Sequence, residues 1–326
     1  MIPNLIFHLG DRKCGSTSIQ HTLGQGLWHS DQGTLAYMAK DHNGPLAQSL
    51  VDMSDTGLAE RRFANLAQRL GRVTADVAVV SAETFEDVAP KALAAMIEAH
   101  LPEYRNSLRL IAYVRLHAGR ILSGFAEQIK RGQSLSDLAG FFAEGVFLER
   151  FTCFERFKSW KDTFGDQFEL RVMDRTLLKD ACVVRDFIDY ALGGVEFSLE
   201  GQVDANPSLC LEDLAVLREM HRIMAAAPAR SSALGAQLGS ILSGMARVQS
   251  SRLMFPQALV QDTIDLCLTD AQSLDDGFFD GTPMADALMS LSAQAVADMA
   301  SVRIEDHYSV DQIRMIQSLI KIMQKQ

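Results

Sequence analysis

Short apolar runs alternate with amphipathic stretches as far as about Leu192, and this alternation limits the fold more than any other feature. The apolar runs, rich in Val, Ile, Leu and Phe, lie at 5–9, 77–81, 108–114 and 168–173. Such runs are typical of strands buried on both faces of a parallel sheet. Helical periodicity occurs between them, at 16–27, 57–70, 90–100, 118–130 and 149–163. The sequence therefore predicts an α/β fold, a parallel sheet flanked by helices.

The pattern changes in the last third of the chain, where only helical periodicity is found. Helices are predicted at 211–226, 234–248, 256–274, 284–299 and 310–323. Gly193-Gly194 is expected to end the preceding helix, and Asn206-Pro207-Ser208 to form a loop that caps the next one. We therefore expect an α/β core at 1–200 and a helical region at 201–326 that packs on or caps the core.

Composition narrows the classes of partner. The chain has 326 residues, with 31 basic and 41 acidic side chains and a net charge of −10. An acidic surface repels phosphate backbones, so nucleic acid is not an expected partner. The five cysteines are scattered without a CxxC pair, which indicates reduced thiols and a cytoplasmic protein. We expect neither a signal peptide nor membrane insertion, because no apolar run approaches the roughly 20 residues of a membrane span.

The segment between the first predicted strand and the first helix has the features of an anion-binding turn. It reads Gly10-Asp11-Arg12-Lys13-Cys14-Gly15-Ser16-Thr17. Glycine permits positive φ and close backbone approach, while a helix N-terminus offers N–H donors and a positive dipole end. Lys13 adds a charge, and Ser16 and Thr17 add hydroxyl groups. The alternative is an ordinary surface turn that caps the helix.

This turn is not a Walker A loop, because Ser16 stands where that motif has its lysine and the lysine lies earlier, at Lys13. It resembles the 5′-phosphosulfate loop of sulfotransferases that use 3′-phosphoadenosine-5′-phosphosulfate (PAPS), usually written PKTGST or PKTGTT. Cys14 replaces threonine and Arg12 replaces proline. The resemblance, to the bacterial polysaccharide or glycan type with its P-loop-like sheet, implies that Arg12, Lys13, Cys14, Gly15, Ser16 and Thr17 bind PAPS as co-substrate.

A second part of the resemblance follows the predicted strand at 108–114. Arg115 ends this strand and Ser123 lies eight residues later on the next helix, which is the spacing of the family's 3′-phosphate pair. A guanidinium suits bidentate contact with a phosphate. The family's usual RDP start is here Arg115-Leu116-His117, and the RKGxxGDW segment of the animal cytosolic enzymes is absent. The alternative for Arg115 is an arginine exposed to solvent.

A third part concerns Glu83, which follows the predicted strand at 77–81. Ligands of α/β sheets bind outside the carboxyl ends of the strands. The resemblance implies that Glu83 is the general base for the acceptor and that Lys13 stabilises the leaving group. The alternative for Glu83 is an N-cap or first-turn acid of the following helix. Rival bases are histidines, at His8, His21, His29 and His117, of which His8 is expected to be a core residue.

The implied activity is in-line transfer of a sulfuryl group from PAPS to an acceptor hydroxyl, on a saccharide or a small metabolite, without a metal. Two alternatives stay open. One is a degenerate P-loop kinase or NTPase, in which Glu83 or Asp174 would act on Mg²⁺; the displaced lysine argues against it. The other is a nucleotide-binding protein of the same fold without catalysis. The sequence indicates neither the acceptor nor the oligomeric state.

Overall fold

The computed structural model describes residues 2–52, 56–144, 151–201, 209–245 and 250–325. The predicted loop Asn206-Pro207-Ser208 and the first residues of the helix predicted at 149–163 lie outside them. By packing, the described chain forms two compact units. The first comprises Met1–Leu116, Cys153–Ala205 and Ser273–Pro283, and the second His117–Thr152, Asn206–Gln272 and Met284–Gln326. The division predicted at residue 200 stays a prediction.

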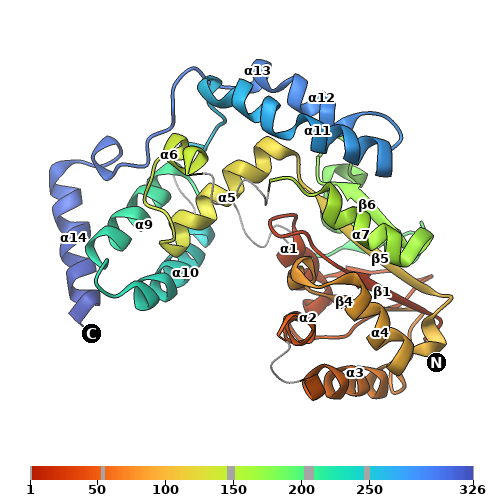
Figure 1. Cartoon of the computed structure of the whole chain (residues 1–326). Helices are drawn as coiled ribbons and strands as arrows, with labels where there is room; N and C mark the ends of the chain where they lie inside the picture. Colours follow the sequence, from red (N-terminus) through yellow and green to blue (C-terminus); the bar gives the residue numbers. More distant parts are fainter. Residues whose placement is uncertain (1, 53–55, 145–150, 202–208, 246–249, 326) are drawn as a thin grey trace. The chain divides into compact units, whose positions relative to one another are not determined.

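The first unit is built on a five-stranded parallel sheet, which confirms the predicted fold class (Figure 1). The strand order is β3-β4-β1-β5-β6. The strands are β1 (Asn4–His8), β3 (Leu35–Tyr37), β4 (Val77–Ser81), β5 (Leu108–Val114) and β6 (Phe168–Val172). β1 pairs in parallel with β4 and β5, so the carboxyl ends of the three strands lie along one edge. Four of these strands were predicted, and β3, with only three residues, was missed.

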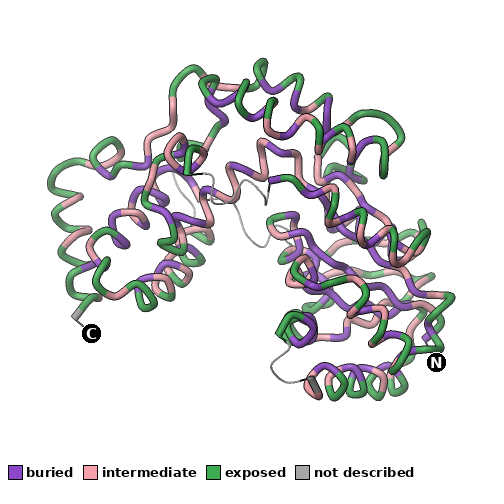
Figure 2. The backbone as a smooth tube through the Cα atoms, viewed as in Figure 1, coloured by how far each residue is buried: buried purple, intermediate pink, exposed green. Residues whose placement is uncertain are grey.

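Helices cover the sheet, and the alternation of side chains along the strands explains how. Ile6 and Tyr113 face a cluster formed with the apolar sides of two helices, α1 (Ser16–Gln25) and α8 (Val183–Leu192). The three inner strands, β4, β1 and β5, are almost wholly buried, whereas β3 and β6 at the edges are partly exposed (Figure 2). The remaining helices of this unit are α2 (Gly44–Val51), α3 (Thr56–Leu70), η1 (Glu83–Asp87), α4 (Pro90–His100), η2 (Pro102–Tyr104), α7 (Phe154–Phe164), η4 (Gly165–Gln167) and η5 (Lys179–Ala181).

Several predicted boundaries are confirmed and others shift for local reasons. Helix α8 ends at Leu192 because Gly193 takes the left-handed conformation (φ 68°), as the Gly193-Gly194 pair predicted. Helix α2 was not predicted from the sequence. A short antiparallel pair, β2 (Trp28–His29) with β7 (Ser198–Leu199), was also missed because two-residue strands leave no periodic signal.

The second unit is helical. It contains α5 (His117–Arg131), α6 (Leu138–Ala143), α9 (Leu211–Ile223), α10 (Pro228–Gly244), η6 (Gln257–Leu259), most of α11 (Val260–Phe278), α12 (Pro283–Met289), α13 (Leu291–Gln294), η7 (Ile304–Asp306) and α14 (Val310–Lys325). His221 of α9 joins three of them, since its ring contacts the Ser231 hydroxyl at 2.6 Å and the Lys130 carbonyl at 3.1 Å. The helix predicted at 284–299 is interrupted after Met289, giving α12 and α13.

Candidate functional site

The turn between β1 and α1 has the backbone shape that its glycines predict. Gly10 (φ 91°) packs so closely on the next strand end that a Cβ would lie 3.1 Å from Glu83 Cα. Gly15 (φ 80°) is the residue before α1, and a Cβ there would meet Val183 of α8 at 2.6 Å. Both positions therefore need glycine, for conformation and for space. Lys13 also has positive φ (64°), which is uncommon for a side chain of this kind.

Backbone hydrogen bonds hold this turn to the end of β5. The Tyr113 N–H donates to the Gly10 carbonyl at 2.7 Å, and the Asp11 N–H donates to the Tyr113 carbonyl at 3.1 Å. Within the turn, the Cys14 N–H (3.3 Å) and the Ser16 hydroxyl (3.4 Å) both donate to the Asp11 carbonyl. The turn is thus an ordered extension of the sheet edge, with Asp11 at its centre.

The predicted cofactor-binding residues of the turn divide into two groups. Lys13 and Thr17 are exposed, whereas Cys14 and Ser16 are buried. The Cys14 side chain lies in the apolar cluster with Ile6, and its N–H donates to the Asp11 carbonyl. The N–H groups at the start of α1, which lack acceptors inside the helix, are those of Gly15, Ser16 and Thr17, since the Ser18 and Ile19 N–H groups already donate to the Gly15 carbonyl. These features are suited to an anion.

Arg115 is brought to the same turn. One of its guanidinium nitrogens donates to the Lys13 carbonyl at 3.1 Å, across 102 residues of sequence. Lys13 and Arg115, which the sequence singled out separately, are therefore neighbours. Ser123 lies half-buried in α5 of the second unit, and its pairing with Arg115 on one phosphate stays a prediction.

Glu83 lies at the edge where the sequence placed it, two residues beyond the end of β4. It is the first residue of the short 3-10 helix η1, follows Ala82 and is half-buried. Both interpretations of Glu83, a first-turn acid and a base beside the turn, share this position. The close approach of Gly10 to the Glu83 backbone places η1 directly against the turn.

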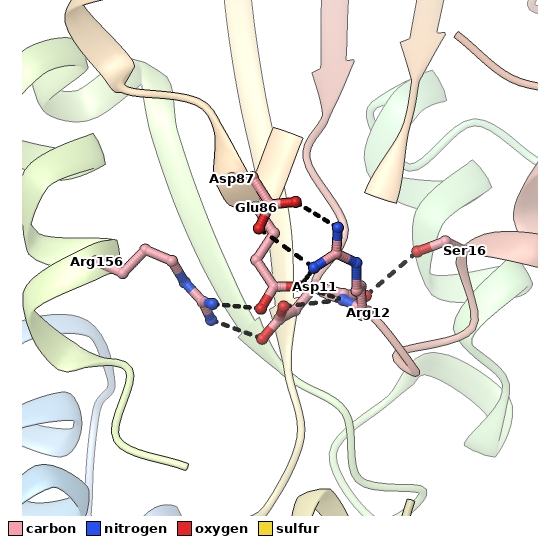
Figure 3. Close-up of polar contacts among 6 residues, drawn as sticks. All are labelled: Asp11, Arg12, Ser16, Glu86, Asp87 and Arg156. Atoms are coloured by element: carbon pink, nitrogen blue, oxygen red, sulfur yellow. Dashed lines mark hydrogen bonds and ion pairs between the residues drawn. The ribbon is translucent and has the colours of Figure 1, made fainter. Parts of the chain in front are cut away.

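Sequence reasoning missed a charged cluster around this contact, shown in Figure 3. Arg156 of α7 bridges two carboxylates: its Nη2 lies 2.7 Å from Asp11 Oδ2, and its Nη1 pairs with Glu86 Oε1. The Asp11 carboxylate is fully buried, and that of Glu86 is 9% exposed. No local signal marks Arg156, which is 145 residues from Asp11 in the sequence. A buried acid directly after Gly10 is the feature that could have prompted a search for a basic partner.

Arg12 was expected to bind the co-substrate, which stays a prediction, and its side chain contacts acids of η1. Its guanidinium pairs with Asp87 and lies 3.8 Å from Glu86. Burial alone would lower the pKa of Arg12, but the hydrogen bond to Asp87 and the charges of Glu86, Asp87 and Glu83 give a net rise. The Arg12 N–H is also occupied, donating to Asp11 Oδ1 at 2.8 Å and to Glu86 Oε2 at 3.3 Å. Arg12 therefore ties the turn to η1.

The rival histidines have separate surroundings. His8 is fully buried in β1, as expected, where its Nδ1 contacts the Ser81 hydroxyl at 2.7 Å and burial lowers its pKa to about 3. His21 and His29 are exposed, and His29 contacts Asp31. His117, buried in the second unit, lies 2.8 Å from the Asp270 carboxylate. A pKa near 3 keeps His8 neutral at physiological pH and makes it a weak base.

Two further observations bear on the site and its setting. Among the residues that the structure describes, no group of three or more His, Cys, Asp or Glu side chains is arranged to hold a metal ion. The expectation that the reaction needs no metal stays a prediction. No helix in the described ranges is both long and apolar enough to cross a membrane.

Comparison with known proteins adds little to this geometry. No protein-family model matches the chain, and no curated protein matches it closely. Among solved structures, the chain is similar to a sulfotransferase from Alicyclobacillus acidocaldarius, with 16% sequence identity and a TM-score of 0.41. The match covers 76% of this chain and 98% of that one. Because the similarity is this low, the proposal below depends on the residues of the site.

Proposed function

We propose that the turn at 10–17 binds the phosphosulfate end of PAPS and that the protein transfers the sulfuryl group to an acceptor hydroxyl. The observation that carries this proposal is the meeting of Arg115 with Lys13 at the carboxyl edge of the parallel sheet. This small region contains two cationic residues, the N-terminus of α1 and a turn whose shape depends on its glycines. Phosphate and sulfate groups are the ligands that such a combination suits.

The proposed reaction is an in-line displacement at sulfur. The acceptor oxygen attacks the sulfur, and the bond between sulfur and the bridging oxygen of the 5′-phosphate breaks. Glu83 takes the hydroxyl proton, and the products are a sulfate ester and adenosine 3′,5′-bisphosphate. Lys13 stabilises the negative charge that develops on the bridging oxygen. Sulfuryl transfer resembles phosphoryl transfer in its loose transition state, so positioning and electrostatics supply most of the catalysis.

The remaining proposed contacts bind the phosphate groups of the nucleotide. Ser16, Thr17 and the amides of the turn hold the 5′-phosphate, while Arg115 holds the 3′-phosphate that distinguishes PAPS from AMP. The acceptor is a hydroxyl-bearing saccharide or small metabolite. We further propose a cytoplasmic location, which is supported by the absence of a disulfide among the five cysteines, all of which lie in the described residues.

The test is ligand binding followed by transfer. The thermal shift produced by adenosine 3′,5′-bisphosphate should exceed that produced by AMP, because only the bisphosphate engages Arg115. ATP and ADP, with and without Mg²⁺, report on the kinase or NTPase alternative. Equal shifts with the bisphosphate and AMP would remove the 3′-phosphate site, and an ATP shift that requires Mg²⁺ would favour a kinase. Bisphosphate binding without transfer to any saccharide or metabolite hydroxyl would indicate a non-catalytic binding protein.

A further inference from the structure

The proposed anion-binding turn contains a buried carboxylate, whose negative charge would repel the anion that the turn binds. Asp11 lies between Gly10 and Lys13, and its side chain is fully buried. Glu86, 9% exposed, meets the same turn from η1, where its Oε2 accepts from the Arg12 N–H at 3.3 Å. A negative charge held this close to a bound phosphosulfate opposes binding, and burial strengthens the repulsion because water screens it less.

Arg156 is arranged to remove this repulsion. Its two terminal nitrogens each take one carboxylate, Nη2 that of Asp11 and Nη1 that of Glu86 (Figure 3). A planar guanidinium can bind two carboxylates from one side chain, whereas a lysine ammonium supplies only a point charge. Arg156 comes from the first turn of α7, a different element from the turn and from η1. It therefore acts on the site from outside it.

Among the described residues of the turn and of η1 and the bases beside them, Arg156 makes the acids and the bases equal in number. The acids of the turn and of η1 are Asp11, Glu83, Glu86 and Asp87, and the bases that pair or lie with them are Arg12, Lys13, Arg115 and Arg156. Four negative charges thus meet four positive ones. Without Arg156 this set of described residues is net negative, and Asp11 and Glu86 lose the ion pairs that they make with it.

We propose that Arg156 is a positioning residue of the anion site. It neutralises Asp11 and Glu86 and clamps the turn to η1, so that the turn can accept an anion and Glu83 stays beside it. This inference rests on the proposed function, since it names what makes the turn receptive to the phosphosulfate. Arg156 itself need not touch the ligand.

The experiment compares dissociation constants of wild type and Arg156→Met between pH 5.5 and 8.5, measured by calorimetry. The probes are adenosine 3′,5′-bisphosphate and inorganic sulfate. At pH 8.5 Arg156→Met should bind both on the order of tenfold more weakly, the size expected for one uncompensated charge about 10 Å away at an effective dielectric near 20. The ratio of the variant's dissociation constant to that of wild type should fall as the pH falls, because a buried carboxyl without its cation takes up a proton more easily.

Further variants separate neutralisation from a general structural role. Arg156→Met combined with Glu86→Gln restores the charge balance and should recover most of the affinity at pH 8.5. Glu86→Gln alone should bind sulfate more tightly than wild type. Arg156→Lys should retain more affinity than Arg156→Met. The matched control is Arg171→Met, which removes an arginine from the buried Asp186 in the same unit and should leave anion affinity unchanged.

The outcomes distinguish this inference from the proposed function. Wild-type affinity in a folded Arg156→Met, or a loss that is the same at every pH and is not recovered by Glu86→Gln, would overturn the role of Arg156 while leaving PAPS binding intact. Sulfate binding without bisphosphate binding would instead overturn the proposed function, and the sulfate data would still decide on Arg156. A wild type that binds neither probe would remove both. If Arg156→Met does not fold, Arg156→Lys, Glu86→Gln and the double variant still give the comparison.

Discussion

The first unit contains two buried carboxylate clusters, one at the turn and one at the start of α8, and they connect different kinds of structure. Asp186 of α8 accepts hydrogen bonds from the Tyr113 hydroxyl at 2.7 Å and from Arg171 at 2.8 Å, so it joins α8 to β5 and β6. At the other cluster, Arg156 joins an irregular turn to a 3-10 helix. The cluster at α8 connects regular elements, whereas the cluster at the turn fixes the shape of a loop beside exposed Lys13.

This difference separates stability from function. Burial and the neighbouring Asp186 carboxylate raise the pKa of Tyr113, which therefore stays protonated and donates its hydrogen bond throughout the physiological range. Loss of the α8 cluster should destabilise the whole unit, because its partners lie on two neighbouring strands of the sheet, β5 and β6. Loss of a group at the turn should first weaken ligand binding. Substitutions at the two clusters should therefore separate the free energy of unfolding from ligand affinity.

The largest effect is expected for Glu83→Gln. Glutamine keeps the shape of glutamate but cannot take the acceptor proton, so sulfuryl transfer should fall by roughly 10²–10⁴ while bisphosphate affinity is retained. The measurement is transfer from PAPS under single-turnover conditions, beside calorimetry of bisphosphate binding. Unchanged transfer with a lower melting temperature would identify Glu83 as a structural first-turn acid, and the base would then be sought among the histidines.

The next largest effect is expected for Lys13→Ala. Removing one donor to the charge that develops in the transition state costs on the order of 10²–10³ in rate. Because Lys13 is exposed, the free energy of unfolding should change little, in contrast to substitutions at the α8 cluster. Lys13→Arg is the matched variant that keeps the charge. A Lys13→Ala protein with near wild-type turnover would exclude the proposed role on the leaving group.

The sequence predicted the part of the site that follows from local pattern. Gly10, Gly15 and Lys13 lie within one turn, and Arg115 and Glu83 each follow a recognisable strand, so the topology of a parallel sheet brings them to one edge. The Arg156 bridge could not be predicted, because an arginine on the polar face of an amphipathic helix has many partners available to it. The direction of the Arg12 side chain also depends on tertiary contacts, with Asp87 and Glu86 of η1.

Asp186→Asn should show the opposite pattern to the substitutions at the turn. The amide loses the charge that binds Arg171 and can no longer accept equally from Tyr113, so the free energy of unfolding should fall on the order of 2 kcal/mol. Bisphosphate affinity measured at a temperature where the variant is folded should match wild type. A selective loss of affinity without a loss of stability would end the distinction between the two clusters. Urea unfolding gives the first quantity and calorimetry the second.

The smallest effect concerns His8, a buried polar group of the same sheet that has no ionic partner. Burial lowers its pKa from 6.5 to about 3, and its Nε2 has no hydrogen-bond partner among the described residues. The unfolded chain binds a proton near pH 6.5 while the folded protein keeps His8 neutral, so stability is full above pH 6.5 and falls as the pH falls toward 3. Between pH 6.5 and 5.5 this contribution is about 1 kcal/mol.

In His8→Gln, which retains a hydrogen-bonding side chain beside Ser81, the decline of stability with falling pH should be shallower by that amount. His221, whose pKa burial also lowers, is present in both proteins and cancels in the difference. Parallel stability curves for the two proteins would mean that folding does not suppress His8 protonation, and a histidine that titrates in the folded state would then be a stronger rival to Glu83 as the base.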